Sequence, residues 1–299
     1  MIRTLITGAA GFTGAYLAPL LASRGHEVHG LFHGDEPKDI SGLDRLYACD
    51  ITDRGAVQSV VDEIQPQHVV HLAAIAYVEH QDVEQMYLAN VVGTRNLLDA
   101  LAGLVQTPRS VIIASSANVY GNSKRGILRE DDPFAPANDY AVTKVATEFV
   151  ASIYSARLPL IIVRPFNYTG RGQSFDFVVP KIVRNARERN PELELGNIDV
   201  ARDFSDVRTV VDAYARLLEA PEAIGETFNV SSGSAISLKE LLSLVGRLSG
   251  HHPAVAVNSN LVRKNDVRSL CGCSDKLREI IGPLKQIPIE ETLRWMLED

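Results

Sequence analysis

The sequence predicts an α/β protein: a doubly wound parallel sheet with a smaller C-terminal lobe interwoven with it. Short apolar runs alternate with helical segments through the first half of the chain, and the connections between them are short. After Pro165 this alternation loosens, yet no repeat or long linker separates a second unit. A length of 299 residues with 45% hydrophobic residues suffices for one large domain, or for a domain with a smaller lobe.

The first half alternates strand and helix in order. An apolar run at residues 2–7 precedes a glycine-rich turn, a helical stretch at 11–24 follows, and Gly25 is placed to end it. The later strands are expected at 27–32, just before Asp50, and at 68–73, 110–115 and 158–164. The later helices are expected at 53–63, 83–102 and 140–156.

The second half contains the less regular elements. Helices are expected at 175–189, 209–219, 237–249 and 289–297, with strands at 192–195 and 227–230. We expect these elements to be interwoven with the first sheet rather than to follow it as a separate domain.

Composition excludes several classes of protein. The 30 basic and 37 acidic residues give a net charge of -7, which argues against binding to nucleic acid. No apolar run is long enough to span a membrane, and Gly8, Gly11 and Gly14 interrupt the N-terminal segment that could imitate a signal peptide. We therefore expect a cytoplasmic protein. The three cysteines make a disulfide framework improbable, and Cys271 and Cys273 lack companions for a metal site.

A glycine-rich turn follows the first strand directly and opens the first helix. Gly8, Gly11 and Gly14 have the spacing Gly-x-x-Gly-x-x-Gly. Glycine permits a tight turn and lets backbone N–H groups approach a pyrophosphate, which the N-terminus of a helix also attracts. The turn predicts a dinucleotide site, although its spacing differs from the Gly-x-Gly-x-x-Gly of the standard fingerprint.

A serine, a tyrosine and a lysine are the candidate catalytic groups. Ser116 follows a predicted strand, while Tyr140 and Lys144 are four residues apart and so share one face of a helix. A nearby ammonium group favours the phenolate, so we expect a buried Lys144 beside a cationic nicotinamide ring to lower the pKa of Tyr140. This set suits general acid–base catalysis at a carbinol or carbonyl oxygen, with Ser116 orienting that oxygen.

Together these motifs resemble the extended short-chain dehydrogenase/reductase family, whose sheet is of the Rossmann type. Other segments match in order: His-Leu-Ala-Ala at 71–74, Asn-Val-Val-Gly-Thr at 90–94, Arg-Pro-Phe-Asn at 164–167 and Arg-Asp-Phe-Ser-Asp-Val at 202–207. The resemblance covers essentially the whole chain. It implies a dinucleotide-binding domain at 1–165, joined by 205–232, and a nucleotide-sugar lobe made of 166–204 and 233–299.

The resemblance also implies roles for individual residues. Ser116, Tyr140 and Lys144 would be the catalytic trio, the last two also touching the cofactor. The remaining cofactor-binding residues would be Gly8, Gly11, Phe12, Gly14, Asp50, Ile51, Leu72, Ala73, Ala74 and Asn90. Asn167, Arg202 and Arg263 would meet the ribose or diphosphate of a nucleotide-sugar substrate, since guanidinium groups match phosphate geometry. Arg263 could instead belong to a solvated charge run. Family likeness further suggests a homodimer through helices 83–102 and 140–156.

The position two residues after Ser116 distinguishes activities within this family. Dehydratases carry an acidic residue there for proton transfer during water elimination, whereas this chain has Asn118, which disfavours a sugar 4,6-dehydratase. Segments 164–173 and 196–204 resemble those of GDP-4-keto-6-deoxy-D-mannose reductases more than those of epimerases. The polar residue that such reductases often carry near Ile75 is absent.

The choice of cofactor depends on the end of the second strand. NAD enzymes usually have an acidic residue there, and NADP enzymes a basic residue nearby. Asp35 lies two residues beyond the expected strand end, while His33 could face a 2′-phosphate, which favours NADPH over NADH. Asp50 could approach an adenine amino group or simply cap the following helix in solvent.

The main hypothesis is therefore an NAD(P)H-dependent reductase of a nucleotide-linked 4-keto-6-deoxyhexose. GDP-4-keto-6-deoxy-D-mannose would yield GDP-D-rhamnose or GDP-6-deoxy-D-talose, and the sequence leaves the C4 configuration and the base open. A nucleotide-sugar 4-epimerase acting on UDP-hexoses would use the same trio. A dinucleotide sensor without catalysis would have no chemical need for it.

Overall fold

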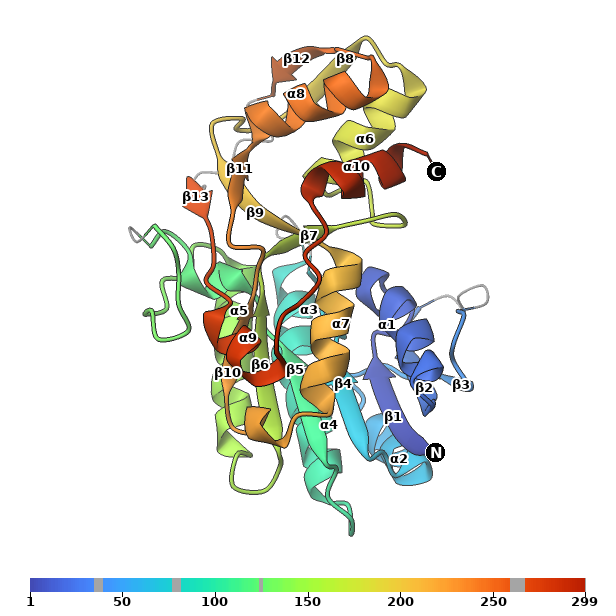
Figure 1. Ribbon diagram of the computed structural model, residues 1–299. Coiled ribbons are helices and arrows are strands. Elements are labelled where there is room, and N and C mark those ends of the chain that lie inside the picture. The colour runs from blue at the N-terminus through green and yellow to red at the C-terminus, as the bar shows by residue number, and fades with distance from the viewer. Residues whose placement is uncertain (35–39, 77–81, 124–125, 259–266, 299) are drawn as a thin grey trace.

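The structure confirms the α/β prediction: a parallel sheet carries helices on both faces, and a smaller lobe lies over one end of it (Figure 1). The computed structural model describes residues 1–34, 40–76, 82–123, 126–258 and 267–298. Within these ranges the large sheet has seven strands: β1 (Ile2–Thr7), β2 (His26–Phe32), β3 (Arg45–Ala48), β4 (His68–His71), β5 (Ser110–Ala114), β6 (Leu160–Pro165) and β10 (Thr227–Val230). All pairs are parallel, in the order β10-β6-β5-β4-β1-β2-β3. The winding therefore reverses between β1 and β4, which is where such sheets bind ligands.

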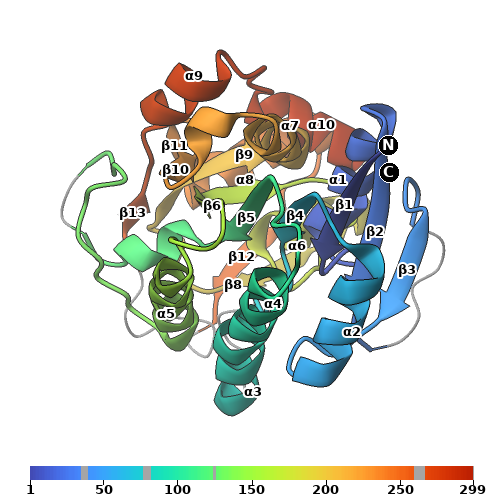
Figure 2. The ribbon, with the colours of Figure 1, turned by 90° about the horizontal axis from the view of Figure 1, so that it is seen from below.

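Helices cover the sheet from both sides (Figure 2). One face is covered by α1 (Phe12–Ser23) and α7 (Val207–Leu218), and the other by α2 (Arg54–Ile64), α4 (Gly93–Ala102) and α5 (Asp139–Ile153). On α7, Val207, Val210, Val211 and Tyr214 recur at helical spacing, and all are buried in the first core cluster. None of the helices in the described ranges is both long and apolar enough to cross a membrane.

The long helix expected at 83–102 contains a wider turn. It divides into α3 (Val83–Tyr87), the π-helical turn η1 (Leu88–Val92) and α4. The amide of Gly93 donates to the carbonyl of Leu88, five residues back. Thr94 and Thr147 donate their hydroxyls to the carbonyl of Asn90, at 2.6 and 3.0 Å. These two hydroxyls help to satisfy the backbone where the regular ladder is interrupted.

In the part of the chain that the structure describes, the smaller lobe combines two small sheets with three helices. One sheet pairs β9 (Ala201–Asp206) with β11 (Ala235–Ser237), β13 (Ser269–Leu270) and β7 (Asn167–Thr169), and the other pairs β8 (Glu192–Leu195) with β12 (Ala254–Val257). The helices are α6 (Val178–Glu188), α8 (Leu238–Ser249) and α10 (Ile289–Leu297). Strand β8 and helices α8 and α10 confirm the predictions for these segments. Helix α6 begins later than expected because Phe177 is extended and serves as its N-cap.

One helix lies outside the lobe that the sequence analysis predicts for residues 233–299. Helix α9 (Asp275–Ile281) falls within the range 233–299. Its Leu277 and Ile281 are buried in the core cluster that also holds α1 and α7. This helix therefore packs with the large sheet, because its apolar side chains meet β10 and α7 rather than the lobe that precedes it in the chain.

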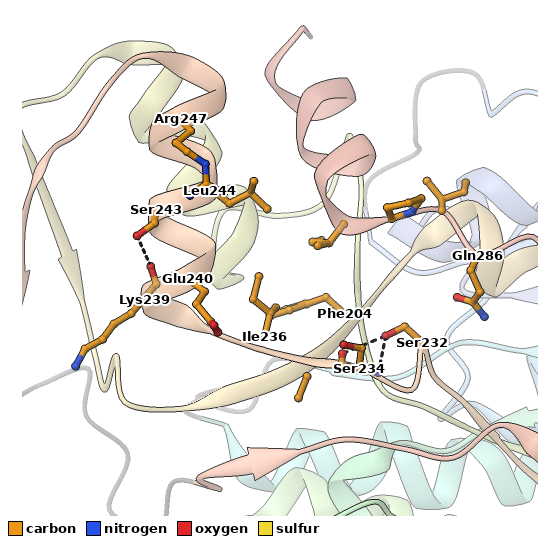
Figure 3. Close-up of a pocket in the computed structure, with 14 residues that line it drawn as sticks. Phe204, Ser232, Ser234, Ile236, Lys239, Glu240, Ser243, Leu244, Arg247 and Gln286 are labelled. Atoms are coloured by element: carbon orange, nitrogen blue, oxygen red, sulfur yellow. Dashed lines mark hydrogen bonds between the residues drawn. The ribbon is translucent and has the colours of Figure 1, made fainter.

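A hollow of about 720 Å³ opens on the smaller lobe between α8, β11 and the segment before α10 (Figure 3). Its lining includes the apolar Phe204 and Leu244 and the charged Lys239, Glu240 and Arg247. The carboxylate of Glu240 is already engaged as the partner of Ser237 in the capping box that starts α8. This hollow does not contain the candidate catalytic trio.

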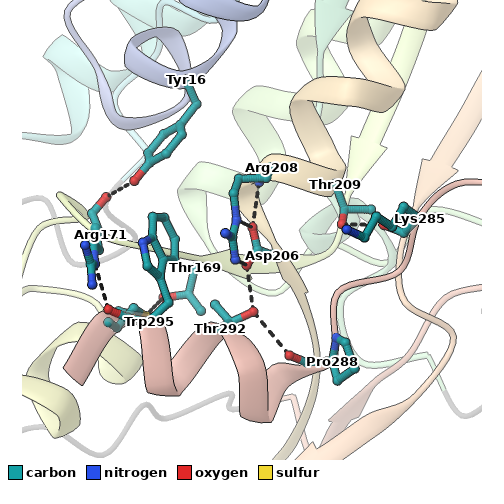
Figure 4. Close-up of polar contacts among 11 residues, drawn as sticks. Tyr16, Thr169, Arg171, Asp206, Arg208, Thr209, Lys285, Pro288, Thr292 and Trp295 are labelled. Atoms are coloured by element: carbon teal, nitrogen blue, oxygen red, sulfur yellow. Dashed lines mark hydrogen bonds and ion pairs between the residues drawn. The ribbon is translucent and has the colours of Figure 1, made fainter. Parts of the chain in front are cut away.

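Helix α10 contacts the large domain through Trp295 (Figure 4). Tyr16 of α1 donates to the carbonyl of Arg171 at 2.8 Å, and Arg171 Nε donates to the carbonyl of Trp295 at 2.6 Å. The guanidinium of Arg208 lies 4.0 Å from the centre of the indole ring and pairs with the buried Asp206. These contacts hold the C-terminal helix close to the helix that begins at the glycine turn.

Candidate active site

A cavity of about 560 Å³ lies at the carboxyl ends of β1, β4, β5 and β6, below the smaller lobe. It collects candidate residues that are far apart in the sequence. Those that line it are Gly8, Gly11, Phe12, Gly14, Leu72, Ala74, Ser116, Tyr140, Lys144, Asn167 and Arg202. The carboxyl ends of parallel strands meet at one edge of the sheet, which explains how the glycine turn and the trio come together.

The glycine turn packs so closely against neighbouring backbone that side chains at Gly8 and Gly14 would clash with it. Gly8 has a φ of +69°, and a Cβ there would stand 2.8 Å from the amide nitrogen of Ala73. A Cβ on Gly14 would stand 2.4 Å from the carbonyl oxygen of Ala9. Within the described residues, no side-chain cap hydrogen bond is made at Gly11, the N-cap residue of α1. A bare helix N-terminus beside a closely approached backbone is a geometry that fits the pyrophosphate of a dinucleotide.

The candidate catalytic trio is buried near the N-terminus of α5. Ser116, Tyr140 and Lys144 are exposed by 6%, 8% and 5% respectively. Lys144 Nζ donates to the carbonyl oxygen of Ala114 at 2.8 Å and lies 5.9 Å from the centre of the Tyr140 ring. The end of β5 thus positions both the serine and the lysine, while the first turns of α5 present the tyrosine between them.

Burial controls the protonation of the trio. It raises the pKa of Tyr140 to about 12, and hydrogen bonding to Ser116 lowers it by less. It lowers the pKa of Lys144 to about 8, against the opposing effect of Glu148. In this structure desolvation has the largest effect on the pKa of Tyr140, and the Lys144 ammonium donates to the carbonyl of Ala114. The lowering of this pKa by Lys144 beside a nicotinamide ring stays a prediction. Tyr140 is a neutral phenol here, the form that can donate a proton.

Residues of the smaller lobe close the cavity from above. Asn167 and Arg202 come from β7 and β9, two strands that pair in parallel. Arg202 Nη1 donates to the carbonyl of Ala201 at 2.9 Å. The adjacent Asp203 is fully buried and accepts hydrogen bonds from the backbone of Ser232 and Gly233, at 2.8 and 2.9 Å. The strand that carries Arg202 is thereby fixed to neighbouring turns.

The family model for GDP-mannose 4,6 dehydratase matches residues 5–296. The chain belongs to this family. This membership confirms the predicted resemblance to the extended short-chain dehydrogenases/reductases, and the match includes both the glycine turn and the C-terminal helix.

Two curated relatives span almost the whole chain. The chain is 32% identical over 281 residues to GDP-6-deoxy-D-talose 4-dehydrogenase of Aggregatibacter actinomycetemcomitans, covering 94% of this chain and 92% of the relative. It is 31% identical over 308 residues to GDP-6-deoxy-D-mannose reductase of Pseudomonas aeruginosa, covering 99% and 96%. Family members so named act on GDP-linked 6-deoxyhexoses.

Two solved structures share the fold over almost their full length. A Burkholderia cenocepacia protein described provisionally as an epimerase superimposes with a TM-score of 0.93 at 46% identity, covering 99% of this chain and 97% of the other. The structure of RMD from Pseudomonas aeruginosa complexed with NADPH superimposes with a TM-score of 0.85 at 28% identity, covering 100% and 98%. The Rossmann-type fold predicted for this family member is thus confirmed.

Several predicted residues of this GDP-mannose 4,6 dehydratase family member lie behind the cavity wall. The side chain of Asn90 binds the backbone of Ile75 on both sides, accepting from its amide at 2.8 Å and donating to its carbonyl at 3.1 Å. Ala73 donates its amide to Thr7 Oγ1 at 3.1 Å. Ile51 is buried against Gly93. Asn90 and Ile51 therefore support the segments that form the wall.

The residues predicted to contact the adenosine part of the cofactor lie near the surface. His33 Nε2 stands 3.7 Å from Asp50 Oδ2, and both side chains are exposed. Asp50 Oδ1 accepts from the amide and the hydroxyl of Thr52, both at 2.8 Å, and the amide bond in particular lowers the pKa of Asp50. Helix α2 has its own cap in Asp53, so Asp50 closes the preceding turn. Asp35 and Arg263 lie outside the described residues.

A buried ion pair behind the trio was missed from the sequence. Glu148 accepts from Arg164 through both carboxylate oxygens, at 2.9 and 2.7 Å, and from the hydroxyl of Ser115 at 2.5 Å. Arg164 also donates to the hydroxyl of Tyr120 at 2.8 Å. Two signals could have found this pair: Glu148 is four residues after Lys144, and Arg164 opens the Arg-Pro-Phe-Asn segment.

Proposed function

We propose that this protein is an NAD(P)H-dependent reductase of a nucleotide-linked 4-keto-6-deoxyhexose, with GDP-4-keto-6-deoxy-D-mannose as its main substrate. The observation that carries this proposal is the single cavity faced by the glycine turn, the trio Ser116–Tyr140–Lys144 and Arg202. The two curated relatives named for GDP-linked 6-deoxyhexoses support the choice of sugar and nucleotide. Their names differ in the C4 configuration, so GDP-D-rhamnose and GDP-6-deoxy-D-talose are both candidate products.

The residues of this chain supply proton transfer and orientation. A bound nicotinamide dinucleotide would supply the hydride for C4. Tyr140, held as a neutral phenol, gives its proton to the C4 oxygen as charge develops there. Ser116 donates a hydrogen bond to the same oxygen. Lys144, close to the tyrosine ring, stabilises the phenolate that remains.

We assign the cofactor as NADPH, with NADH as the alternative. The turn formed by Gly8, Gly11 and Gly14 would hold its pyrophosphate, and His33 at the end of β2 would face the 2′-phosphate. The NADPH complex of the Pseudomonas aeruginosa structure supports this choice. The change His33→Ala should weaken NADPH binding about threefold to tenfold and leave NADH binding unchanged, measured as the Kd of each cofactor. Equal weakening of both would contradict the assignment.

We assign Asn167 and Arg202 to the ribose and diphosphate of the substrate, and we retain Arg263 as a prediction. Arg202 lines the cavity from β9 of the smaller lobe and carries the planar cation that suits phosphate. Arg202→Lys should raise the KM for the nucleotide-sugar more than it lowers kcat. A change in kcat alone would place Arg202 in catalysis instead.

The side chain of Asn118 distinguishes the proposed reductase from a 4,6-dehydratase. Its amide cannot act as the acid or base that water elimination requires, so we infer that the chain does not catalyse a 4,6-dehydration despite the description of its family model. A 4-epimerase is the second candidate, favoured by the Burkholderia cenocepacia protein at 46% identity. An epimerase returns its hydride to the sugar and shows no net oxidation of added NAD(P)H. A reductase consumes one equivalent for each sugar reduced.

We also propose a homodimer formed through α3, η1, α4 and α5. Large apolar side chains stay exposed along these adjacent helices: Val83, Leu88, Val92, Val142, Phe149 and Ile153. Phe149 is exposed by 61% and Ile153 by 74%, which is costly on a monomer. Phe149→Lys should give a monomer in light scattering, whereas the control Val105→Lys, on a loop outside this face, should not change the mass. A dimer that survives Phe149→Lys would contradict the proposal.

The sequence division remains our proposal for the domains: 1–165 with 205–232 for the dinucleotide, and 166–204 with 233–299 for the sugar, except that α9 packs with the former. The position of β10 and α7 within the large domain supports this division.

We also propose that the protein is cytoplasmic. Its three cysteines are buried free thiols, a state typical of reducing compartments. Fractionation of the native cells tests this placement.

The direct experiment follows the absorbance of NADPH and NADH with GDP-4-keto-6-deoxy-D-mannose. Turnover should be lost in Tyr140→Phe and retained in Tyr154→Phe, a matched change at the C-cap of the same helix, where the hydroxyl donates to Asp99 instead. Oxidation of neither cofactor by the unaltered protein would refute the reductase, and epimerisation of UDP-hexoses would then be assayed.

A further inference from the structure

Asn118 determines which part of the Ser116 hydroxyl faces the cavity. The backbone amide of Asn118 donates to Ser116 Oγ at 3.2 Å, and the side-chain Nδ2 donates to the same atom at 3.1 Å. A serine hydroxyl has two lone pairs that accept and one proton that donates. Since both lone pairs are occupied by Asn118, the proton is what remains for Tyr140 or for a ligand.

The backbone around Asn118 holds this arrangement in place. Ser116 is the N-cap of the short 3₁₀ helix η2 (Ala117–Tyr120), in which Asn118 lies. The carbonyl of Asn118 accepts from the amide of Gly121 at 3.0 Å. Ser115, just before the cap, is tied to the buried carboxylate of Glu148 at 2.5 Å. Both sides of the Ser116–Asn118 contact are therefore anchored to buried structure.

We infer that Asn118 is a positioning residue that makes Ser116 an obligatory hydrogen-bond donor to the C4 oxygen of the substrate. This inference rests on the proposed function. The C4 oxygen of a ketone gains negative charge as hydride arrives, and donors aimed at it strengthen as that charge develops. Without the Nδ2 donor, the Ser116 proton could turn toward position 118 and leave a lone pair facing the same oxygen.

An acidic side chain at this position would reverse the arrangement. The carboxylate of Asn118→Asp has nearly the shape of the amide but only accepts, so the Ser116 proton would point to it. We expect kcat to fall roughly 10- to 100-fold at pH 8, on the order of the loss of one donor to a developing oxyanion, with little change in KM. As the pH falls, protonation of the new carboxyl restores a donor, so the ratio of variant to wild-type kcat should rise.

Two further variants separate positioning from a general disturbance. Asn118→Ala removes the Nδ2 donor without adding a charge, so its kcat should fall less, with a pH-independent ratio to wild type. In a Ser116→Ala background, Asn118→Asp should have no additional effect, because the hydroxyl through which it acts is gone. Equal pH profiles for Asn118→Asp and Asn118→Ala, or independent multiplicative effects in the double variant, would overturn the inference.

A second readout does not depend on turnover. In the ligand-free protein, the side-chain amide signals of Asn118, assigned by their loss in Asn118→Asp, should shift in nitrogen–proton NMR spectra when Ser116 becomes alanine. Unchanged signals would refute the hydrogen bond. If the unaltered protein reduces no keto-sugar, the proposed function fails, and these signals still decide whether Asn118 directs Ser116.

Discussion

The buried Lys144 should make the stability of the fold depend on pH in the alkaline range. Burial lowers its pKa from 10.5 to about 8, so between these values the unfolded chain binds a proton that the folded chain has released. Stability therefore rises with pH there. At 1.36 kcal/mol for each unit of pKa, this group should contribute about 2 kcal/mol of added stability between pH 7 and pH 9.5.

Urea unfolding at these two pH values tests the argument. Wild-type protein should gain about 2 kcal/mol relative to Lys144→Met on going from pH 7 to pH 9.5, since methionine cannot titrate. The matched control is Lys285→Met, at an exposed position, which should follow wild type. If wild type and Lys144→Met show parallel pH dependence, Lys144 is not a desolvated ammonium and the electrostatic description of the trio fails.

Three other changes test the surrounding structure. Glu148→Gln leaves the buried Arg164 guanidinium without its charge partner and should lower the free energy of unfolding in urea by about 3 kcal/mol or more. An unchanged free energy of unfolding would refute the role of this ion pair. Gly14→Ala places a Cβ against the carbonyl of Ala9 and should raise the Kd for NADPH about tenfold, and unchanged binding would contradict the fit of the turn. Asp53→Ala removes the α2 cap and should cost about 1 kcal/mol, with NADPH binding retained.

The sequence contained enough information for the large sheet and for the cavity. The sequence predicted β1 and β10 of the large sheet, and β8 of a small sheet, with the bounds that the structure shows. Once the strands are known to be parallel, Gly14 and Tyr140 are required to lie at the same edge of the sheet. The relation between distant motifs thus followed from topology, without any knowledge of side-chain packing.

Other features depend on packing that no local pattern records. The π-helical turn at Leu88–Val92 has the same apolar spacing as an α-helix, so the sequence predicted one continuous helix. The strand β9 reads as Ala-Arg-Asp-Phe-Ser-Asp, and the buried carboxylate of Asp203 accepts hydrogen bonds from Ser232 and Gly233, which lie far along the chain. The pKa values of Tyr140 and Lys144 follow from the depth of burial, which residue spacing alone does not give.

The most direct test of the account is the fate of the transferred hydrogen. NADPH or NADH carrying deuterium at the transferable position of its nicotinamide is incubated with GDP-4-keto-6-deoxy-D-mannose, and the sugar product is analysed by NMR. The account predicts one deuteron at C4 for each cofactor oxidised, and no incorporation with Tyr140→Phe. A product without deuterium, or sugar conversion without oxidation of added cofactor, would contradict the central claim that this chain is a C4 keto-sugar reductase.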